Sequence, residues 1–232
     1  MRLSVIVPTL NEGAVIEGLL RELQPLRRLG HEVIVSDGGS DDDTCARAQP
    51  LVDRLLQGRA GRAAQMNRGA AVARGDILWF LHADTRFPVS AETCLAAFSP
   101  APEAWGFCMV RLDAPQRGFR IIEWFMNRRS RLTRVATGDQ GMFVARDLFQ
   151  QLGGFAEIPL MEDVELSKRL RQQAAPQVLA GPLLASARRW QRGGILRTVL
   201  LMWRLRLAYF LGAPPQRLAE KYRLCRSPTR ES

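Results

Sequence analysis

The sequence predicts an α/β fold, with a Rossmann-like, mostly parallel sheet, helices on both of its faces, and a basic amphipathic helical tail. Short apolar runs alternate with helical patterns through the first half of the chain. The clearest run, I-L-W-F-L at residues 77–81, is apolar throughout, as expected for a strand buried on both faces. The 232 residues and an apolar fraction of 47% suffice for one sizeable core.

The expected elements follow one another with short linkers. Strands are predicted at residues 3–7, 32–35, 51–56 and 77–81, with helices between them at residues 14–29, 41–48 and 62–74. Pro25 is expected to kink or shorten the first helix, and Gly30 to end it. Further strands are predicted at residues 105–112 and 141–144, and further helices at residues 119–134 and 162–171. We expect one domain over residues 1–190 and a helical extension over residues 191–232.

The cysteines and the N-terminus bear on the cellular compartment. The four cysteines form no C-x-x-C pair, so reduced thiols in a cytoplasmic protein are expected. The apolar stretch at the N-terminus is too short for a signal peptide, because Asn11 and Glu12 interrupt it. We interpret it as a buried strand.

The positive charge is confined to the C-terminal part of the chain. Residues 184–230 hold ten Arg, one Lys and one Glu, which accounts for the whole net charge of +10. A near-neutral domain with a basic tail indicates a polyphosphate leaving group or an anionic membrane surface as partner, or both. It argues against nucleic acid, which favours a basic surface throughout. A solvated basic helix is the structural alternative.

The longest apolar stretch, residues 198–212, is interrupted by Arg204 and Arg206. It is shorter than the roughly 20 apolar residues that a membrane span requires. The pattern suits an interfacial helix, on the inner face of the cell membrane, with arginines among the lipid headgroups. It suits equally a helix docked on its own domain or on a second subunit of a homodimer.

Polar residues follow the first two predicted strands, at the sheet edge where ligands bind in α/β folds. Pro8, Thr9, Asn11 and Glu12 follow the first strand. The second leads into S-D-G-G-S-D-D-D-T, in which Asp37 and Gly38 precede the turn. A carboxylate at position 37 is placed to hold ribose hydroxyls or a base N–H.

The aspartates after Gly38 have a simpler interpretation. Ser40 or Asp41 is a good N-cap for the helix predicted at residues 41–48. Asp42 and Asp43 then lie in its first turn, where acids are favourable.

His82 and Asp84 follow the buried strand at residues 77–81 with Ala83 between them. Strand alternation would send both side chains the same way. An imidazole and a carboxylate that converge can bind a divalent cation, which in turn binds phosphates. The alternative is a His–Asp hydrogen bond that closes the strand end.

Four further clusters carry polar chemistry. A helix start preceded by glycine, which suits an anion, carries Arg62, Gln65, Asn67 and Arg68. The other clusters are Asp139 and Gln140 in T-G-D-Q-G, Glu162 and Asp163 at a helix start, and Arg188, Arg189 and Trp190. Acids at a helix start stabilise its dipole in any protein, which is the structural alternative for Glu162 and Asp163.

Together these motifs resemble the inverting family 2 glycosyltransferases, which have the GT-A fold. The matching pieces cover residues 1–190 in the family's order: V-I-V-P-T-L-N-E, V-I-V-S-D-G-G-S-D-D-D-T, G-R-A-x-Q-x-N-x-G, L-H-A-D-T, G-G-F…M-E-D and A-R-R-W. More narrowly, H-A-D-T, T-G-D-Q-G and S-A-R-R-W resemble a small bacterial branch of transferases associated with radical-SAM and selenodomain proteins.

The resemblance implies a role for each motif. Pro8, Thr9, Glu12, Asp37 and Gly38 would hold the nucleotide, with Arg62, Gln65 and Asn67 closing over it. His82, Ala83 and Asp84 would replace the family's D-x-D metal motif. Asp163 would be the catalytic base, with Glu162 beside it raising its pKa. Asp139, Gln140, Arg188, Arg189 and Trp190 would handle the diphosphate and the acceptor.

His82 departs from the family's usual aspartate. A neutral imidazole lowers the negative charge of the site and favours Mn²⁺ over Mg²⁺. It also allows a site with weak metal binding or none, in which the C-terminal arginines carry the leaving-group charge.

The implied reaction is a displacement at the anomeric carbon of a UDP- or GDP-sugar, with Asp163 taking the proton of the acceptor hydroxyl. The acceptor is unidentified, and the basic tail favours a lipid-linked one. A nucleotidyltransferase would need a glycine-rich, basic first loop in place of P-T-L-N-E. A non-catalytic sugar-nucleotide or membrane-surface binding protein would need no acids at three strand ends.

Overall fold

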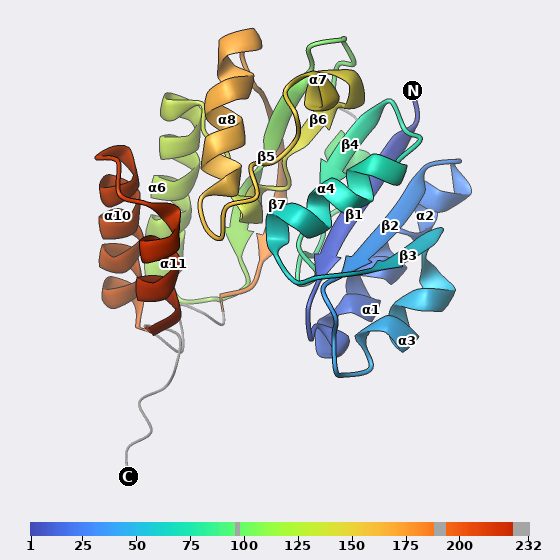
Figure 1. The fold of residues 1–232 in the computed structure, drawn as a ribbon, viewed down its shortest axis with the longest axis horizontal. Helices are drawn as coiled ribbons and strands as arrows, with labels where there is room; N and C mark the ends of the chain where they lie inside the picture. Colours follow the sequence, from blue (N-terminus) through green and yellow to red (C-terminus); the bar gives the residue numbers. More distant parts are fainter. Residues whose placement is uncertain (96–97, 188–193, 225–232) are drawn as a thin grey trace.

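The computed structural model describes residues 1–95, 98–187 and 194–224. A seven-stranded sheet with the order β3-β2-β1-β4-β6-β5-β7 runs through the molecule (Figure 1). Its strands are β1 (Leu3–Thr9), β2 (Glu32–Asp37), β3 (Arg54–Gln57), β4 (Ile77–Phe80), β5 (Trp105–Leu112), β6 (Phe143–Ala145) and β7 (Gln177–Ala185). β6 is antiparallel to β4 and β5, and the other pairs are parallel. The mostly parallel sheet predicted from the sequence is confirmed.

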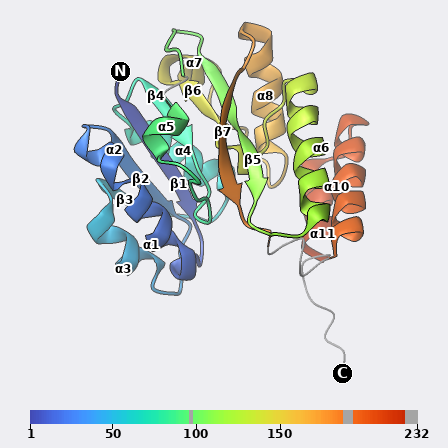
Figure 2. The ribbon, with the colours of Figure 1, turned by 180° about the vertical axis from the view of Figure 1, so that it is seen from behind.

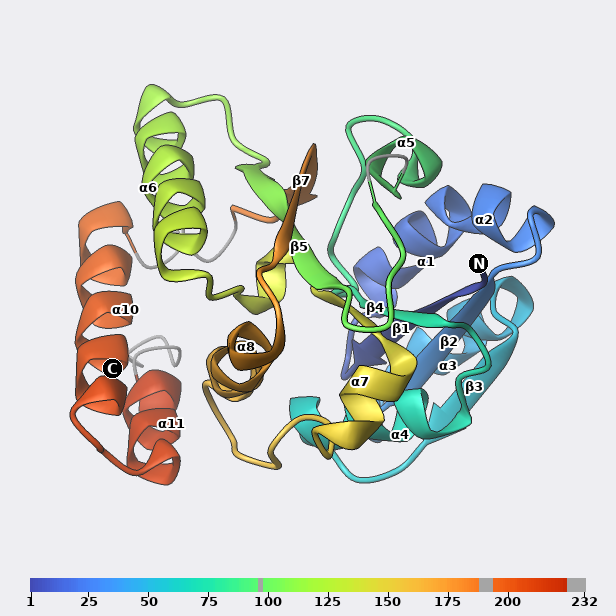
Figure 3. The same ribbon diagram turned by 90° about the horizontal axis from the view of Figure 1, so that it is seen from above.

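Helices cover both faces of this sheet, as predicted. They are α1 (Gly13–Glu22), α2 (Gln24–Arg28), α3 (Thr44–Ala48), α4 (Arg62–Val72), α5 (Ala91–Leu95), α6 (Arg117–Thr133), α7 (Arg146–Gln151), α8 (Glu162–Gln173), α10 (Ile195–Phe210) and α11 (Pro215–Leu224). Helices α1, α2, α3 and α5 lie on one face, and α4, α7 and α8 on the other (Figure 3). Helices α6, α10 and α11 lie beyond β5 and β7, at the end opposite β3 (Figure 2).

The central strands are buried on both sides because helices cover both faces of the sheet. Every residue of β2 and of β4 is buried. The indole N–H of Trp79 donates to the Gly141 carbonyl at 3.1 Å, and that of Trp105 to the Ala174 carbonyl at 2.8 Å. Both tryptophans are thus fully buried without an unpaired polar atom at the indole.

The first predicted helix breaks where proline was expected to break it. α1 ends at Glu22, and α2 begins at Gln24 after one intervening residue, with Pro25 in its first turn. Gly30 follows with φ +86°, a left-handed conformation that glycine adopts at low cost.

Three predictions need correction. The third strand begins at Arg54 rather than at residue 51, because a 3₁₀ turn, Gln49–Leu51, precedes it. The helix predicted at 41–48 begins only at Thr44. The edge strand β7 was not predicted, since Gly181 and Pro182 interrupt its apolar pattern; proline is tolerated at a sheet edge because it need not donate there.

The C-terminal helices dock on the chain's own domain. Leu205 of α10 and Leu218 of α11 are buried in one apolar cluster with Val135, Met161 and Val164. The ammonium of Lys168 on α8 lies 4.5 Å from the ring centres of Tyr209 and Phe210. One side of α10 therefore packs on protein. Within the described ranges, every helix is too short or too polar to cross a membrane.

Candidate functional site

The loops after β1 and β2 lie at one edge of the sheet, because these neighbouring strands are parallel. Asn11 connects them: its backbone N–H donates to Ser40 Oγ at 2.8 Å, and its side-chain oxygen accepts from the Asp41 N–H at 2.9 Å. The Gly13 N–H donates to Asp42 Oδ2 at 3.1 Å. Asn11 adopts φ +54°, which asparagine tolerates better than most residues. The two loops form one hydrogen-bonded unit.

Asp37 is the buried centre of this unit. Its Oδ1 accepts from Thr9 Oγ1 at 2.9 Å and from Ser40 Oγ at 2.5 Å, and its Oδ2 accepts from the Gly39 and Ser40 N–H groups at 2.8 Å each. Burial alone would raise the pKa of Asp37, but the donors on Ser40, Thr9 and Gly39 outweigh it and lower the pKa. A carboxylate offers about four acceptor positions, and protein donors fill all of them here. Asp37 shapes the loop in this structure, and its contact with a nucleotide stays a prediction.

The expected helix caps at Ser40 and Asp41 are wrong. Ser40 gives its hydroxyl to Asp37, and α3 begins after Asp43, whose side chain makes no capping bond. Asp42 accepts from the Thr44 N–H at 3.0 Å instead.

Two polar side chains of α4 connect parts of the fold. Gln65 is buried and donates to the carbonyls of Thr9 at 2.6 Å and Ser36 at 3.0 Å. Asn67 exchanges two hydrogen bonds with the backbone of Phe155, at 2.8 Å and 2.9 Å. Both residues hold strand ends and the G-G-F loop in place.

A pocket gathers four of the sequence motifs on the α4 and α8 side of the sheet. We call it the Asp163 pocket; it is lined by Arg62, Met66, Phe80, His82, Gly138, Met142, Phe155, Glu162 and Asp163. The start of α4, the end of β4, the T-G-D-Q-G turn and the start of α8 are far apart in sequence and meet here.

Asp163 is oriented by one N–H group of its own helix and by one from the T-G-D-Q-G turn. Its Oδ2 accepts from the Gly138 N–H at 2.7 Å, and its Oδ1 from the Val164 N–H at 2.7 Å. Met161, just before α8, adopts φ +72°, an uncommon conformation for a side chain of its kind. Backbone strain of this sort occurs often at functional sites.

Glu162 is buried beside Asp163 and pairs with Arg62 at 3.6 Å. Burial raises the pKa of Glu162, and the charge of Asp163 raises it further; Arg62 offsets part of the rise. Two adjacent carboxyls in different surroundings are a common arrangement for acid–base chemistry.

Two neighbouring residues of the T-G-D-Q-G turn make contacts in different directions. Asp139 Oδ1 lies 3.3 Å from Nδ1 of His82. Gln140 is buried, and its side-chain oxygen accepts from Ser130 Oγ at 2.8 Å and from the Thr137 N–H at 3.0 Å. Gln140 therefore fixes the turn against α6, while Asp139 contacts His82.

A second pocket, of about 210 Å³, lies on the α1 side of the same strand end. We call it the Asp84 pocket; it is lined by Val15, Asp84, Arg86, Asp113, Leu184, Ser186 and Ala187. Backbone bonds between Arg86 and Leu184, at 3.0 Å and 2.8 Å, hold its wall together. Two carboxylates and a hydroxyl thus line one opening.

His82 and Asp84 do not share a pocket. The expectation relied on strand alternation, but β4 ends at Phe80 and the chain turns, with the Thr85 N–H donating to the His82 carbonyl at 3.0 Å. His82 lines the Asp163 pocket and Asp84 the other. Among the described residues, no group of three or more His, Cys, Asp or Glu side chains is arranged to hold a metal ion.

Sequence reasoning missed Arg129, Asp113 and Ser186. Arg129 of α6 donates to Ser130 Oγ at 2.7 Å; burial lowers its pKa, while the charges of Asp163 and Asp139 act in the opposite direction. No local pattern distinguishes Arg129 from the other arginines of α6. The position of Asp113 directly after the predicted strand at residues 105–112 was a usable signal. Ser186 had no such signal, because the strand that it follows, β7, was not predicted.

Of the other residues predicted for the site, Pro8 and Glu12 are described by the structure, and three others are not. Pro8 and Glu12 are half-buried at the end of β1. Arg188, Arg189 and Trp190 lie outside the described residues, directly after Ala187 in the sequence.

Comparison with known proteins gives a family and a set of similar folds. The profile described as Glycosyl transferase family 2 matches residues 4–149. The uncharacterized glycosyltransferase Rv1514c of Mycobacterium tuberculosis is 32% identical over 165 residues, which are 66% of this chain and 62% of that relative. The chain therefore matches less than two thirds of that relative's length.

Two solved structures have similar folds. The mannosyltransferase PcManGT from Pyrobaculum calidifontis, in complex with GDP-Man and Mn²⁺, has a TM-score of 0.64 and 21% identity, covering 89% of this chain and 61% of that one. Glucosyl-3-phosphoglycerate synthase from Mycobacterium tuberculosis, in complex with Mn²⁺, UDP and glucosyl-3-phosphoglycerate, has a TM-score of 0.56 and 26% identity, covering 77% and 70%.

Proposed function

Because the chain belongs to glycosyl transferase family 2, whose profile spans residues 4–149, we propose that it transfers a sugar from a nucleoside-diphosphate sugar to an acceptor hydroxyl, with inversion. The observation that carries the proposal is the Asp163 pocket, which joins four separated motifs at the sheet edge where α/β folds bind ligands. A histidine and an arginine meet there with a carboxylate that can accept a proton from an acceptor hydroxyl. A structural role for one motif alone would not require all four to meet.

Asp163 is the proposed base. The Gly138 N–H holds one of its oxygens at 2.7 Å and so fixes the direction of the carboxylate. Glu162 pairs with Arg62 and is less suited to accept a proton from substrate. A base positioned in this way contributes typically about 10²–10⁴-fold. One base and one displacement predict inversion at the anomeric carbon, which proton NMR of the product would report.

The donor diphosphate is proposed to lie at the Asp84 pocket. Asp84 and Asp113 contribute carboxylate oxygens to one opening, and oxygen donors suit Mn²⁺ or Mg²⁺. Asp84 would hold such a cation, with Asp113 as the additional carboxylate; His82, which faces the other pocket, would not. When bound, the cation supplies positive charge against the leaving diphosphate. PcManGT and glucosyl-3-phosphoglycerate synthase were both solved with Mn²⁺, which supports a divalent cation here.

The segment from His82 to Asp84 separates the two pockets. We propose that the sugar lies across this segment, with its diphosphate on the Asp84 side and the acceptor hydroxyl on the Asp163 side. Pro8, Glu12 and Asp37 are proposed to border the nucleotide. A UDP- or GDP-sugar is the proposed donor, since the two solved relatives contain UDP and GDP-Man.

The proposal is tested without knowledge of the acceptor. The protein is incubated with UDP-, GDP- and dTDP-sugars, with and without Mn²⁺, and both its melting temperature and the released nucleoside diphosphate are measured. We expect one nucleotide series to raise the melting temperature, more so with Mn²⁺, and slow release of its diphosphate with water as acceptor. Neither a shift nor release with any of them would refute the proposal.

Two narrower assignments stay proposals. The motifs H-A-D-T, T-G-D-Q-G and S-A-R-R-W favour the branch associated with radical-SAM and selenodomain proteins. The division into a domain at residues 1–190 and an extension at 191–232 is favoured by the two helices α10 and α11, which pack on the side of the sheet domain.

A further inference from the structure

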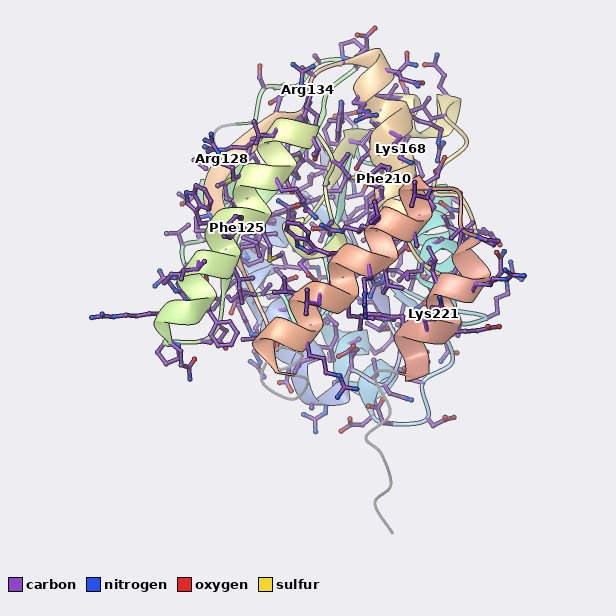
Figure 4. All side chains as sticks on the ribbon, turned by 90° about the vertical axis from the view of Figure 1, so that its left-hand side faces the viewer. Phe125, Arg128, Arg134, Lys168, Phe210 and Lys221 are labelled. Atoms are coloured by element: carbon purple, nitrogen blue, oxygen red, sulfur yellow. The ribbon has the colours of Figure 1, made fainter. Side chains whose placement is uncertain are left out.

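Helices α6 and α10 lie side by side at one end of the molecule and expose large apolar side chains to solvent (Figure 4). We call this set the α6/α10 face. Its members are Ile121, Trp124, Phe125, Leu132, Leu200, Trp203, Leu207, Phe210 and Leu211, each 55% exposed or more. Large exposed apolar groups that gather on one face of a protein mark a surface that binds something.

The exposed residues form one stripe on each helix. On α6 the apolar members lie at residues 121, 124, 125 and 132, and on α10 they lie at residues 200, 203, 207 and 210, with Leu211 next to them, which is the spacing of a single helical side. The exposed Arg128 and Arg204 lie within the same two stripes. The opposite side of each helix packs on the protein. Phe119 and Ile122 of α6 are buried in a cluster against β5 and β7, and Leu205 of α10 is buried against α8. Packing within the chain therefore does not account for the outward stripes.

The exposed charges among these stripes are positive. Helix α6 has five arginines and a single acid, Glu123, which is 8% exposed and accepts from the Leu112 N–H inside the protein. Helix α10 has three arginines and no acid. Arg128 lies 5.9 Å above the ring of Trp124, and Arg204 is exposed between Trp203 and Leu207.

We propose that the α6/α10 face docks on the surface of an anionic lipid bilayer. Tryptophan, phenylalanine and leucine with arginines interspersed suit the boundary between acyl chains and acidic headgroups. A second copy of the chain fits less well, because a two-fold interface pairs a patch with itself. Arginines of one copy would then face arginines of the other, with no exposed acid on either helix to pair with them.

The start of α8 packs on the inward side of α10, opposite the exposed stripe. Met161, which precedes Glu162, shares a buried cluster with Leu205 of α10. A protein docked through α6 and α10 would therefore hold the Asp163 pocket near the membrane. An acceptor attached to a lipid would reach the site from the same surface.

The test uses vesicles of phosphatidylcholine with 30% phosphatidylglycerol, and vesicles of phosphatidylcholine alone, in a flotation assay with the full chain. We expect binding to the anionic vesicles, weakened by salt, and at least tenfold less to the neutral ones. Phe125→Ser combined with Trp203→Ser should reduce vesicle binding at least tenfold, and so should Arg128→Gln combined with Arg204→Gln. The matched control is Leu29→Ser, which changes an exposed leucine at the end of α2 and should leave binding unchanged.

Folding and self-association are measured on the same proteins. The changed side chains are exposed, so the melting temperatures should stay within a few degrees of the parent. The proposal is overturned if the parent does not bind anionic vesicles, or if the substituted proteins bind as well as it does. It is also overturned if sedimentation without lipid shows a dimer that Phe125→Ser with Trp203→Ser dissociates, because the face then belongs to a second copy. Donor binding is independent of all these outcomes.

Discussion

Buried carboxyl groups occur in two regions, the loops after β1 and β2 and the Asp163 pocket. The surroundings shift the pKa downward in the first region and upward in the second. Asp37 receives four protein hydrogen bonds, which lower its pKa. Glu162 is buried beside a like charge, which raises its pKa in spite of Arg62. Hydrogen-bond donors around a carboxylate stabilise the folded state. Carboxyl groups that lie close together with few donors destabilise it. The first region is therefore the frame of the site, and the second is where we place the chemistry.

The largest expected effect is that of Asp163→Asn. Losing the base should reduce diphosphate release about 10²–10⁴-fold, while the donor-induced rise in melting temperature changes little. Because asparagine has one acceptor oxygen for the Gly138 and Val164 N–H groups, the free energy of unfolding should fall by about 1–3 kcal/mol. Asp147→Asn, at a side chain that is 89% exposed on α7, is the matched control and should keep full activity. A fully active Asp163→Asn protein would remove this residue from the mechanism.

Asp37→Asn should act on stability first. The amide oxygen can keep the Gly39 and Ser40 N–H groups only if the NH2 faces the Thr9 and Ser40 hydroxyls, which must then accept rather than donate. Replacing bonds to a charged carboxylate in this way should cost about 1–3 kcal/mol in the free energy of unfolding by urea. The exposed Asp41→Asn in the same loop is the control. If the variant lost nucleotide affinity while its free energy of unfolding stayed unchanged, Asp37 would not act by holding the loop in place. That result would favour a direct contact between Asp37 and the donor.

Gly138→Ala should disturb the Asp163 pocket without changing a charge. A Cβ at this position would lie 2.6 Å from Nε2 of His82, so the imidazole must move. We expect about a tenfold loss of activity, since small displacements at a site are costly. His82→Ala should make the substitution at residue 138 nearly neutral, and a double-mutant cycle of the four proteins measures this. Equal losses in both backgrounds would show that the imidazole is not the cause.

The smallest expected effect is a difference in the pH dependence of stability. The folded state of Glu162 holds its proton at higher pH than the unfolded state, whose pKa is near 4.5. The parent should therefore lose stability as the pH rises above that value, and Glu162→Gln should lack this loss. Asp37 has the opposite sign: its contribution is present above its unfolded pKa of 3.8 and is lost as the pH falls through the lower folded value. Urea unfolding of the parent and of both variants from pH 3 to 8 separates the two; parallel curves would contradict the assignment.

Much of the fold was predictable because burial leaves a local pattern. Residues 105–112 and the start of the helix at Glu162 were predicted at the bounds that the structure has. β7 was missed because glycine and proline interrupt its pattern, and the start of α3 because Ser40 pairs with Asp37 across the turn. When a side chain such as Ser40 has two possible hydrogen-bond partners, the neighbouring sequence alone does not show which partner it binds.

Some residues of the candidate site were also predictable from the sequence, and others were not. The motifs predicted site roles for Arg62, His82, Glu162 and Asp163, since each follows a strand or begins a helix at the edge where ligands bind, and the structure places these four residues in one pocket. They did not identify Arg129, which comes from the middle of a helix that is rich in arginine. They also joined His82 to Asp84, although the chain turns between the two pockets.

The sequence alone determined the alternation of strands and helices, the order of the motifs and the end of the sheet at which they meet, because the spacing of apolar residues fixes which positions are buried. Only the tertiary structure decided that Asp37 is saturated with donors, that His82 and Asp84 face different pockets, and that α6 and α10 expose apolar stripes together. Those features depend on contacts between segments far apart in the chain, and no local pattern encodes the partner that a polar side chain finds there.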